Sequence, residues 1–512
     1  MLKNGFKYGF NLGYQGPRRP VFSKNLRSAA ARPNIVLEKL FKEVEAGRMA
    51  GPFASSPLRN LRISPVGLVP KSDGGWRLIT HLSYPRSGGS INDGISQELK
   101  SVSYTKFDTV VDMVFSLGKS ALMAKRDIRS AFRLLPVSPL DFELLGIHVD
   151  GKIFINLNMP FGASCAPFYF ETFSSFIHWL VKDRSNIPFL DHYLDDFIFC
   201  GAKGTDDCQT LISTFHQICG DLGVPINDEK STAPSTVMVF LGLEIDSDNM
   251  QIRIPYHKRQ ELEVIIQGVL KKDKITLRDL QSLTGKLCFF AQAIRSSRAF
   301  LRRFYDAMAG VKREFYKIRI THGMREDLRM WLEFLSNFNG ICPMPDFSWS
   351  ENETLKLFTD SAGQSDLGCG CYFDGKWAFF QWPLHWARLE VMKDITFLEM
   401  VPVLLCMFLW STELQNKKII LRTDNEALVA ILNKQSTKSK RIMRFLRCFV
   451  LLCMRYNVIF KAIHISTKLN DIADSISRKQ WARLSQLVPE SAVRVPVPKG
   501  FHDMIYRTRL DA

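Results

Sequence analysis

The sequence predicts an α+β protein built from several domains. Between residues 34 and 250, short apolar runs alternate with turns marked by Gly and Pro, which is typical of mixed strands and helices. Between 251 and 345, apolar residues recur at helical spacing with Lys and Arg between them. A linker, NGICPMPDFSW, then precedes an α/β unit over residues 346–480. A chain of 512 residues is also too long for one ordinary domain.

The two ends of the chain lack such periodicity. Residues 1–33 are rich in Gly, Pro, Arg and aromatics, and we expect them to form a loosely ordered basic arm. Residues 481–512 carry several Pro and no clear period, which predicts a tail. The predicted division is therefore 1–33, 34–250, 251–345, 346–480 and 481–512.

Charge and composition restrict the partners and the compartment. The sequence has 68 Lys and Arg against 51 Asp and Glu, a net charge of +17, which indicates a polyanion such as nucleic acid. The apolar run MVPVLLCMFLW is too short to cross a bilayer, so we expect a buried helix and no membrane partner. The eleven Cys form no C-x-x-C pair, which favours free thiols in a reducing, intracellular compartment, the cytoplasm or the nucleus.

Paired acids stand where two apolar runs of the first half end. Asp127 ends the run in SALMAKRDIRSAF, and Asp195 and Asp196 lie between the two runs of LDHYLDDFIFCG. If these segments are neighbouring strands, Asp127 and Asp195 converge, and oxygen ligands of this kind suit Mg²⁺. Two such ions support in-line phosphoryl transfer. The alternative is an ordinary hairpin turn with solvated acids.

The neighbouring motifs resemble those of reverse transcriptases. YLDD at 193–196 is similar to the aromatic-x-Asp-Asp turn of that family, and the other motifs follow in family order over most of residues 60–250. The resemblance implies a right-hand polymerase, with fingers and palm over 34–250 and a helical thumb or connection over 251–345. It assigns Asp127 and Asp195 as metal ligands, and leaves Asp196 as either a second ligand or a turn residue.

The same resemblance implies a site for the incoming dNTP. In VGLVPKSDGGWRLITHLSYP, Lys71 and Arg77 match the basic residues that grip the triphosphate, the alternative being an ordinary solvated hairpin. Phe132 matches the aromatic that stacks under the sugar and excludes a 2′-hydroxyl, the alternative being a core residue. In NMPFGASCAPFYFETF, Phe161 and Gly162 are expected against the nascent base pair.

Two further motifs complete the polymerase resemblance. Lys230, in INDEKSTAP, matches a Lys that protonates pyrophosphate, with a plain surface Lys as the alternative. FLGLEI at 240–245 matches the turn that holds the primer end.

A second group of acids lies in the C-terminal unit. Because a buried unpaired acid is costly, four acids abutting apolar segments suggest a shared cation. Their order resembles ribonuclease H, which implies an α/β ribonuclease H-like domain with two Mg²⁺ that cuts the RNA of an RNA–DNA hybrid. His464, ten residues before the last acid, matches the mobile His of that family, or is a structural or surface His. The four acids are Asp360, Glu399, Asp424 and Asp474.

Basic helical segments supply candidate contacts to nucleic acid. The segment 433–447, NKQSTKSKRIMRFLR, interleaves cations with apolar residues and is either a solvated face or a phosphate-binding face. The segment 275–305 is similarly basic, and its expected contacts are to backbone phosphates.

Together these features predict an RNA-directed DNA polymerase of a retroelement with a fused ribonuclease H. Its expected ligands are an RNA template, a DNA or RNA primer, the RNA–DNA hybrid, dNTPs and two Mg²⁺ (or Mn²⁺) per site. ITHLSYPRSGGSIN, MPFGASCAP and ADSISR resemble elements of the DIRS group, which implies a tyrosine recombinase as partner; Ty3-like elements and pararetroviruses share many of these residues. The alternatives are a catalytically silent RNA-binding scaffold and an RNA-dependent RNA polymerase. Phe132 argues against the RNA polymerase.

Overall fold

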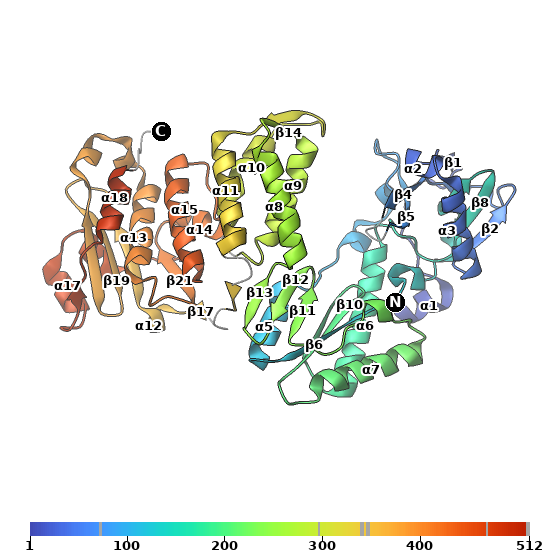
Figure 1. Cartoon of the computed structure of the whole chain (residues 1–512), viewed down its shortest axis with the longest axis horizontal. Coiled ribbons are helices and arrows are strands. Elements are labelled where there is room, and N and C mark those ends of the chain that lie inside the picture. The colour runs from blue at the N-terminus through green and yellow to red at the C-terminus, as the bar shows by residue number, and fades with distance from the viewer. Residues whose placement is uncertain (71–73, 295–296, 338–341, 345–348, 467–468, 508–512) are drawn as a thin grey trace. The chain divides into compact units, whose positions relative to one another are not determined.

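The computed structural model describes the whole chain except residues 71–73, 295–296, 338–341, 345–348, 467–468 and 508–512 (Figure 1). Internal contacts divide the chain into two compact units, Met1–Thr236 and Val237–Ala512. Strands and helices alternate in both units, which confirms the predicted α+β class. The division into five parts stays a prediction.

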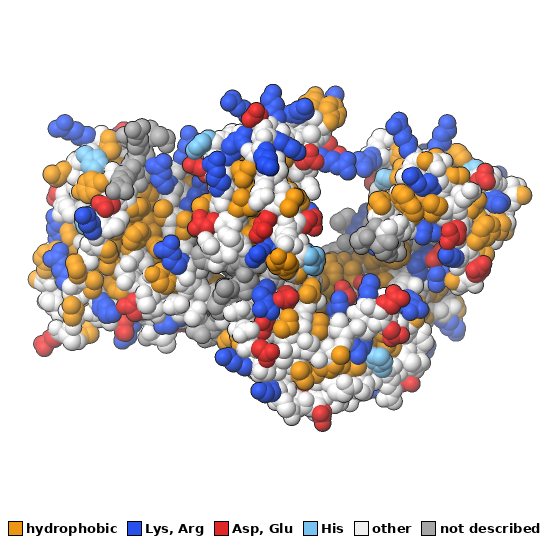
Figure 2. All heavy atoms as spheres, viewed as in Figure 1, with side chains coloured by type: hydrophobic (Ala, Val, Ile, Leu, Met, Phe, Trp, Pro, Cys, Tyr) orange, Lys and Arg blue, Asp and Glu red, His pale blue; other side chains and the backbone are white. Residues whose placement is uncertain are grey.

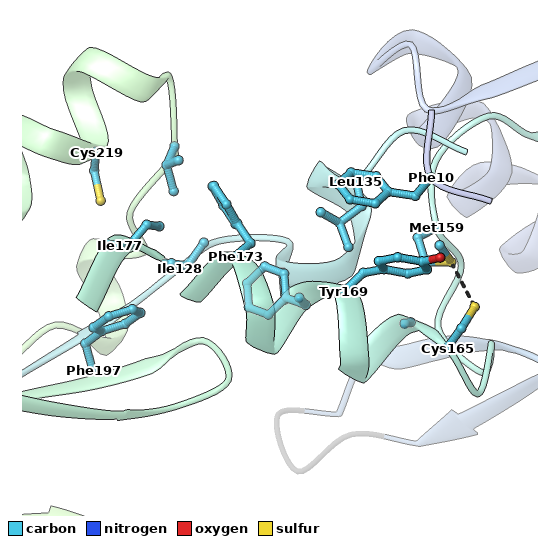
Figure 3. Close-up of a cluster of buried hydrophobic side chains, with 14 of the residues drawn as sticks. Phe10, Ile128, Leu135, Met159, Cys165, Tyr169, Phe173, Ile177, Phe197 and Cys219 are labelled. Atoms are coloured by element: carbon cyan, nitrogen blue, oxygen red, sulfur yellow. Dashed lines mark hydrogen bonds between the residues drawn. The ribbon is translucent and has the colours of Figure 1, made fainter. Parts of the chain in front are cut away.

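A three-stranded antiparallel sheet forms the centre of the first unit. Its strand order is β6 (Leu122–Asp127), β10 (Asp196–Gly201) and β9 (Leu190–Tyr193). The apolar residues of β10 are fully buried, and Phe197 and Phe199 pack against Phe215 of α7 (Asp207–Leu222). The long helix α6 (Ala166–Ser185) contributes Tyr169, Phe173 and Ile177 to the same core (Figure 3).

A second sheet and a hairpin complete the first unit. The five-stranded sheet has the order β1 (Val21–Phe22), β3 (Arg62–Ile63), β7 (Gly146–Val149), β8 (Lys152–Asn156) and β2 (Met49–Phe53). The hairpin pairs β4 (Val66–Pro70) with β5 (Trp76–Thr80). The further α-helices are α2 (Arg27–Ala30), α3 (Pro33–Glu45), α4 (Ile91–Gly94) and α5 (Phe107–Leu117).

The N-terminal segment differs from the loosely ordered arm that we expected. Residues Leu2–Tyr8 form helix α1, and Phe10 is buried in the core of the first unit (Figure 3). The rings of Phe6 and Phe173 lie 5.0 Å apart, as do those of Phe10 and Tyr169. The aromatic residues that mark this segment therefore order it, because they bury apolar surface against α6.

The second unit begins with a sheet followed by helices. The sheet has the order β11 (Val237–Phe240), β12 (Leu243–Asp246), β13 (Gln251–Arg253) and β16 (Cys342–Pro343). A small antiparallel sheet pairs β14 (Lys274–Thr276) with β15 (Lys317–Arg319). The helices of this part are α8 (Tyr256–Leu270), α9 (Leu277–Phe290), α10 (Arg302–Met308) and α11 (His322–Asn337).

The C-terminal part of the second unit is α/β. Its antiparallel strands are β18 (Leu357–Ser361), β19 (Gly368–Phe373) and β20 (Lys376–Gln381). Its parallel strands are β17 (Trp349–Ser350), β21 (Lys418–Thr423) and β22 (Ile459–His464), and β21 lies beside β18. The helices are α12 (Asn352–Leu355), α13 (Ile395–Trp410), α14 (Glu426–Lys434), α15 (Lys440–Arg455) and α16 (Asp471–Ser477).

Helix α13 contains the apolar run that was expected to be a buried helix, and the structure confirms this. Most of its side chains, from Phe397 to Trp410, are buried. Among the helices that the structure describes, none has the length and hydropathy needed to cross a bilayer.

The C-terminal segment also differs from the predicted tail. Residues Trp481–Leu487 form α17, Val493–Arg494 form β23, which pairs in parallel with β20, and Lys499–Arg507 form α18. Phe501 and Ile505 of α18 are fully buried. The Pro residues that obscured the periodicity separate these short elements, each of which is too short to show a period by itself.

Candidate active sites

The paired acids of the first unit meet at one end of the three-stranded sheet. Asp127 is the last residue of β6 and Asp196 is the first of β10, and the two are direct partners in the antiparallel register. Asp195 occupies the turn between β9 and β10, and its carbonyl accepts a hydrogen bond from the amide of Ile128, at 3.0 Å. The structure therefore brings together the three acids that the sequence motifs single out.

The turn that carries Asp195 has an unusual backbone. Tyr193 and Asp196 pair across it, so Leu194 and Asp195 form a two-residue loop, and Leu194 has a φ of 53°. Two-residue hairpin loops favour residues with positive φ, but Gly or Asn normally occupies that position. The amide of Leu194 donates to Glu171 Oε2, at 3.2 Å, and thereby gains a partner from α6.

The electrostatics of this group favour a bound cation. Burial, and then the negative charges of Asp127 and Asp196, raise the pKa of Asp195 to about 6. Burial also raises the pKa of Asp196, against the lowering effect of Lys125, whose Nζ lies 3.7 Å from Asp196 Oδ1. Carboxylates that are destabilised by burial and by one another become favourable when a divalent cation neutralises them. An all-oxygen ligand set suits Mg²⁺ or Mn²⁺.

Asp127 is almost fully buried and has two side-chain donors. Asn227 Nδ2 donates to Asp127 Oδ1 at 3.0 Å, and Lys230 Nζ donates to Asp127 Oδ2 at 2.9 Å. The hydrogen bond to Asp127 raises the pKa of Lys230. The predicted Lys230 thus reaches the acid cluster, with a side chain that is still largely exposed.

A cavity of about 720 Å³ joins these acids to the predicted nucleotide-binding residues. Asp127, Asp195, Lys230, Arg77 and Phe161 all contribute to its walls. Lys71 lies outside the described residues.

The two predicted aromatics lie against each other, and Phe161 lines this cavity. The ring of Phe132 lies 5.4 Å from that of Phe161 and 5.6 Å from that of Phe170, which is fully buried. Phe161 itself is half exposed. Gly162 has a φ of +108°, and a Cβ there would lie 2.5 Å from the carbonyl oxygen of Thr80, so only glycine permits this close approach to β5.

The second group of acids converges in the C-terminal α/β part. Asp360 on β18, Glu399 on α13 and Asp424 after β21 place carboxylate oxygens within 4.8 Å of one another. Burial, followed by the charges of Asp474 and Asp424, raises the pKa of Asp360 to about 7, while a hydrogen bond from Ser477 opposes the shift. Burial and the charge of Asp360 likewise raise the pKa of Glu399. These oxygens fit a hard divalent cation.

Asp474 and His464 lie near this group but have other partners. Asp474 Oδ1 accepts from Arg478 Nε at 2.6 Å, and its Oδ2 lies 3.5 Å from Arg483 Nη1. His464, the last residue of β22, has its Nε2 3.2 Å from the carbonyl oxygen of Asp424. The structure therefore places all five predicted residues in one region, with three acids in direct proximity.

The basic segment 433–447 uses part of its charge inside the protein. Arg447 Nη2 lies 3.1 Å from Oδ2 of the buried Asp327, and Arg441 Nη1 lies 3.6 Å from Asp394 Oδ2. These two cations neutralise acids of their own unit, so the segment is neither wholly a solvated face nor wholly a phosphate-binding face.

Sequence reasoning missed several polar residues that support the two sites. Asn227 lies three residues before Lys230, and Lys125 lies two residues before Asp127, so their position near the motifs was an available signal. Glu171 and Ser477 also lie within quoted motifs, NMPFGASCAPFYFETF and ADSISR, but a polar residue on a helix is usually exposed, so neither was singled out.

Comparison with known proteins finds a family match for the part of the chain that contains the first of these sites. Residues 69–245 match the family described as reverse transcriptase (RNA-dependent DNA polymerase). The chain contains a reverse transcriptase domain. This domain includes the cavity-lining residues Arg77, Asp127, Phe161, Asp195 and Lys230.

Curated relatives of the reverse transcriptase domain come from viruses and a transposon. The chain is 27% identical over 184 residues (35% of this chain) to Protein P of Heron hepatitis B virus and 23% identical over 241 residues (47%) to the Transposon Tf2-7 polyprotein of Schizosaccharomyces pombe. It is 22% identical over 252 residues (49%) to the Pro-Pol polyprotein of Simian foamy virus type 1. The matched regions span 23%, 16% and 20% of these relatives, respectively.

Solved structures similar in fold extend beyond the reverse transcriptase domain. The foamy viral protease-reverse transcriptase in complex with double-stranded DNA aligns with a TM-score of 0.52 and 14% identity, covering 88% of this chain and 72% of that one. Its complex with an RNA/DNA hybrid aligns with a TM-score of 0.50 and 16% identity, covering 90% and 57%. The fold is therefore that of a polymerase followed by a further domain.

Proposed function

We propose that this protein is an RNA-directed DNA polymerase that also has ribonuclease H activity. One observation carries the proposal: a single cavity in the reverse transcriptase domain unites the acids Asp127 and Asp195 with the cations Arg77 and Lys230 and with Phe161. Converging carboxylates, exposed cations and an aromatic surface are the parts that nucleotidyl transfer requires.

The residues of the cavity have distinct roles in this proposal. Asp127 and Asp195, with Asp196 beside them, would hold two Mg²⁺ or Mn²⁺, which supply charge stabilisation for the attacking and leaving oxygens. Arg77, from β5, binds the triphosphate of the incoming dNTP. Lys230 orients Asp127 and donates a proton toward pyrophosphate. The hydrogen bonds of Arg77 to the triphosphate and of Lys230 to Asp127 are charge-assisted and therefore strong.

The aromatic pair selects the nucleotide. Phe161 presents a half-exposed face to the cavity, and Phe132 lies against it with Phe170 behind. In this proposal, the ring of Phe132 packs under a deoxyribose and leaves no room for a 2′-hydroxyl. With Gly162 holding the loop close to β5, we expect dNTP to be preferred over rNTP.

The second acid group supplies the ribonuclease H activity. Asp360, Glu399 and Asp424, with Asp474 nearby, would hold Mg²⁺ in a ribonuclease H-like domain within residues 346–480. The buried pair, Asp360 and Glu399, has raised pKa values and so gains most from a cation. His464, at the exposed edge of this site, assists the release of cleaved RNA.

A basic surface on the second unit is the expected contact for the template and primer. Lys and Arg side chains gather around the paired strands β14 and β15 and the adjoining ends of α8 and α9 (Figure 2). Contacts of this kind bind phosphates without sequence preference. The two foamy viral structures hold double-stranded DNA and an RNA/DNA hybrid, which supports the same ligands here. The exposed cations are Lys271, Lys272, Lys274, Arg278, Lys312, Arg313, Lys317 and Arg319.

The biological setting follows from the motifs. We assign the protein to a retroelement, most similar to the DIRS group, with a tyrosine recombinase of the same element as a partner and with the cytoplasm or nucleus as its compartment. Ten of the eleven cysteines are seen as free thiols, which supports a reducing compartment.

Primer extension on labelled RNA with Mg²⁺ tests both activities. We expect Asp195→Asn to abolish extension and spare RNA cleavage, and Asp424→Asn to do the reverse. Replacing dNTPs by rNTPs distinguishes an RNA polymerase, and inactivity of the wild-type protein in both assays would favour a silent scaffold. Persistent extension by Asp195→Asn contradicts the assignment of the polymerase site.

A further inference from the structure

We propose that Glu171 and His192, which lie behind the turn that carries Asp195, are positioning residues for the polymerase reaction. The proposal rests on the proposed polymerase function. Glu171 belongs to α6 and His192 to β9, and both side chains are nearly fully buried. Neither belongs to the cavity that holds the acids.

Glu171 reaches the turn directly. Its Oε2 accepts a hydrogen bond from the amide of Leu194, at 3.2 Å, and its Oε1 lies 3.2 Å from His192 Nε2. The second contact is close but not aligned as a hydrogen bond, so it acts as an electrostatic contact. One buried carboxylate therefore holds both the turn and the strand that leads into it.

A second histidine continues this contact away from the turn. The Nδ1 atoms of His178, on α6, and His192 lie 2.9 Å apart. Burial lowers the pKa of His178 to about 4, so this ring is uncharged at neutral pH. If His178 Nδ1 carries the proton, it donates to His192 Nδ1, and a proton on His192 Nε2 then faces Glu171. In this arrangement the two Nδ1 atoms satisfy each other, and Nε2 of His192 keeps its electrostatic contact with Glu171.

The surrounding residues restrict movement of His192. Its ring stacks on that of Phe197, with centroids 5.1 Å apart and planes at 18°, and Phe197 is fully buried. Asp191 Oδ1 accepts from the amide of His192, and Asp191 Oδ2 from the hydroxyl of Thr105. The polar chain is thus fixed on one side by the core and on the other by its own strand.

The strained turn explains why such support matters. Leu194 holds a left-handed φ that a branched side chain adopts at a cost, and such conformations persist only where the surroundings impose them. Asp195 follows directly, so a relaxed Leu194 would displace its carboxylate from Asp127. A misplacement of about 1 Å at a reacting centre lowers a rate by up to about a hundredfold.

Glu171→Ala and Glu171→Gln separate positioning from folding. We expect Glu171→Ala to lower kcat for primer extension about tenfold or more, to raise the Mg²⁺ concentration needed for half-maximal rate, and to leave the KM for dNTP within about twofold. Glu171→Gln keeps an oxygen that accepts from Leu194 and should recover most of the rate. Asp183→Ala, which removes an exposed acid from the same helix, is the matched control and should behave as wild type.

Hydrogen exchange of the Leu194 amide tests the contact without any activity. We expect slow exchange in the wild-type protein, fast exchange in Glu171→Ala and slow exchange in Glu171→Gln. Fast exchange in the wild type, or an unchanged kcat in a folded Glu171→Ala, overturns the proposal. A wild-type protein that shows the exchange pattern but no primer extension refutes the polymerase function and leaves the contact between Glu171 and the turn established.

The two histidines also allow a direct check on the nature of their contact. The donor atoms of His178, Asp191 and His192 lie within 4.8 Å of one another, which a transition metal could bridge. We expect purified protein to hold no stoichiometric Zn²⁺. One Zn²⁺ per chain that is lost in His178→Gln would replace the hydrogen-bonded pair by a metal site and overturn this part of the assignment.

Discussion

Lys230 Nζ donates to Asp127 Oδ2 at 2.9 Å, a contact that joins residues 103 positions apart in the sequence. It places a cation against the buried acid of the candidate polymerase site, while the lysine side chain itself remains accessible from the cavity. This single contact accounts for a predicted residue whose motif alone did not distinguish it from an ordinary surface lysine.

Replacing Lys230 tests this contact. We expect Lys230→Ala to lower kcat for primer extension by about a hundredfold, the range in which a lost proton donor usually falls. Lys230→Arg keeps the charge and should retain more of the rate, although its planar group does not reproduce an ammonium. Steady-state kinetics with a single dNTP measures both. A Lys230→Ala variant with wild-type kcat contradicts a role for this side chain in the reaction.

Asp195 links metal binding to stability. Because folding raises its pKa from 3.8 to about 6, the folded state binds more protons than the unfolded state between these values. The free energy of unfolding therefore falls as the pH rises through this window and stays lower above it. At pH 7.5 without divalent cations, we expect Asp195→Asn to raise the Tm by about 2–4 °C.

Added Mg²⁺ should narrow the difference in Tm between the two proteins. A cation that binds only the folded state stabilises it, so Mg²⁺ should raise the Tm of the wild type more than that of Asp195→Asn. Thermal unfolding with and without 10 mM Mg²⁺, roughly the saturating range for weak sites, measures this. Equal Mg²⁺ shifts in both proteins would argue against Asp195 as a ligand.

Ser477 controls the charge of Asp360 in the second site. Its hydroxyl donates to Asp360 Oδ2 at 2.6 Å and partly offsets the effect of burial, which leaves the pKa of Asp360 at about 7. Ser477→Ala should raise that pKa further and leave Asp360 less ionised at pH 7. We expect the pH–rate profile for RNA cleavage to move to higher pH, with a loss at pH 7 that is recovered near pH 8.5.

A neighbouring serine serves as control for that experiment. Ser475, on the same helix, is also buried, but its hydroxyl donates to the carbonyl of Asp471 rather than to an acid. Ser475→Ala should leave the profile in place. A profile that moves equally in both variants would indicate a general effect on α16 instead of a specific hydrogen bond.

Asp327 connects helix α11 to the C-terminal α/β part. Its carboxylate is buried and lies 2.9 Å from Arg303 Nη1 and 3.1 Å from Arg447 Nη2. Burial raises its pKa to about 6 in spite of the two arginines, so desolvation outweighs their attraction. Replacing Asp327 by Ala leaves the charge of the largely buried Arg447 without its carboxylate partner. We therefore expect Asp327→Ala to lower the free energy of unfolding by about 3–5 kcal/mol.

Glu326 provides the matched comparison for Asp327. It is the adjacent acid, about half exposed, and contacts the same Arg303 at 3.4 Å. Exposed pairs contribute about 0–1 kcal/mol, so Glu326→Ala should change the urea-unfolding midpoint little. Similar losses in the two variants would show that the burial of Asp327 is not what makes its contacts important.

Local sequence patterns were enough to predict the acids that the structure brings together in two groups. Acids that end apolar runs are costly unless they share a cation, so Asp127, Asp195, Asp360 and Asp424 stood out by their positions in the sequence alone. The α+β class and the buried helix α13 followed equally from local patterns, because strand and helix periods are properties of neighbouring residues. The flanking segments did not follow, since short elements ordered by distant aromatic contacts show no period of their own.

The support of these residues, in contrast, depends on the tertiary structure. The contacts of Leu194 with Glu171, of Lys230 with Asp127 and of Arg447 with Asp327 span 23, 103 and 120 residues. Whether a polar side chain on a helix faces solvent or a buried acid depends on the path of the whole chain. The raised pKa values of Asp195 and Asp360 have the same origin, because burial is a property of the fold and not of the motif.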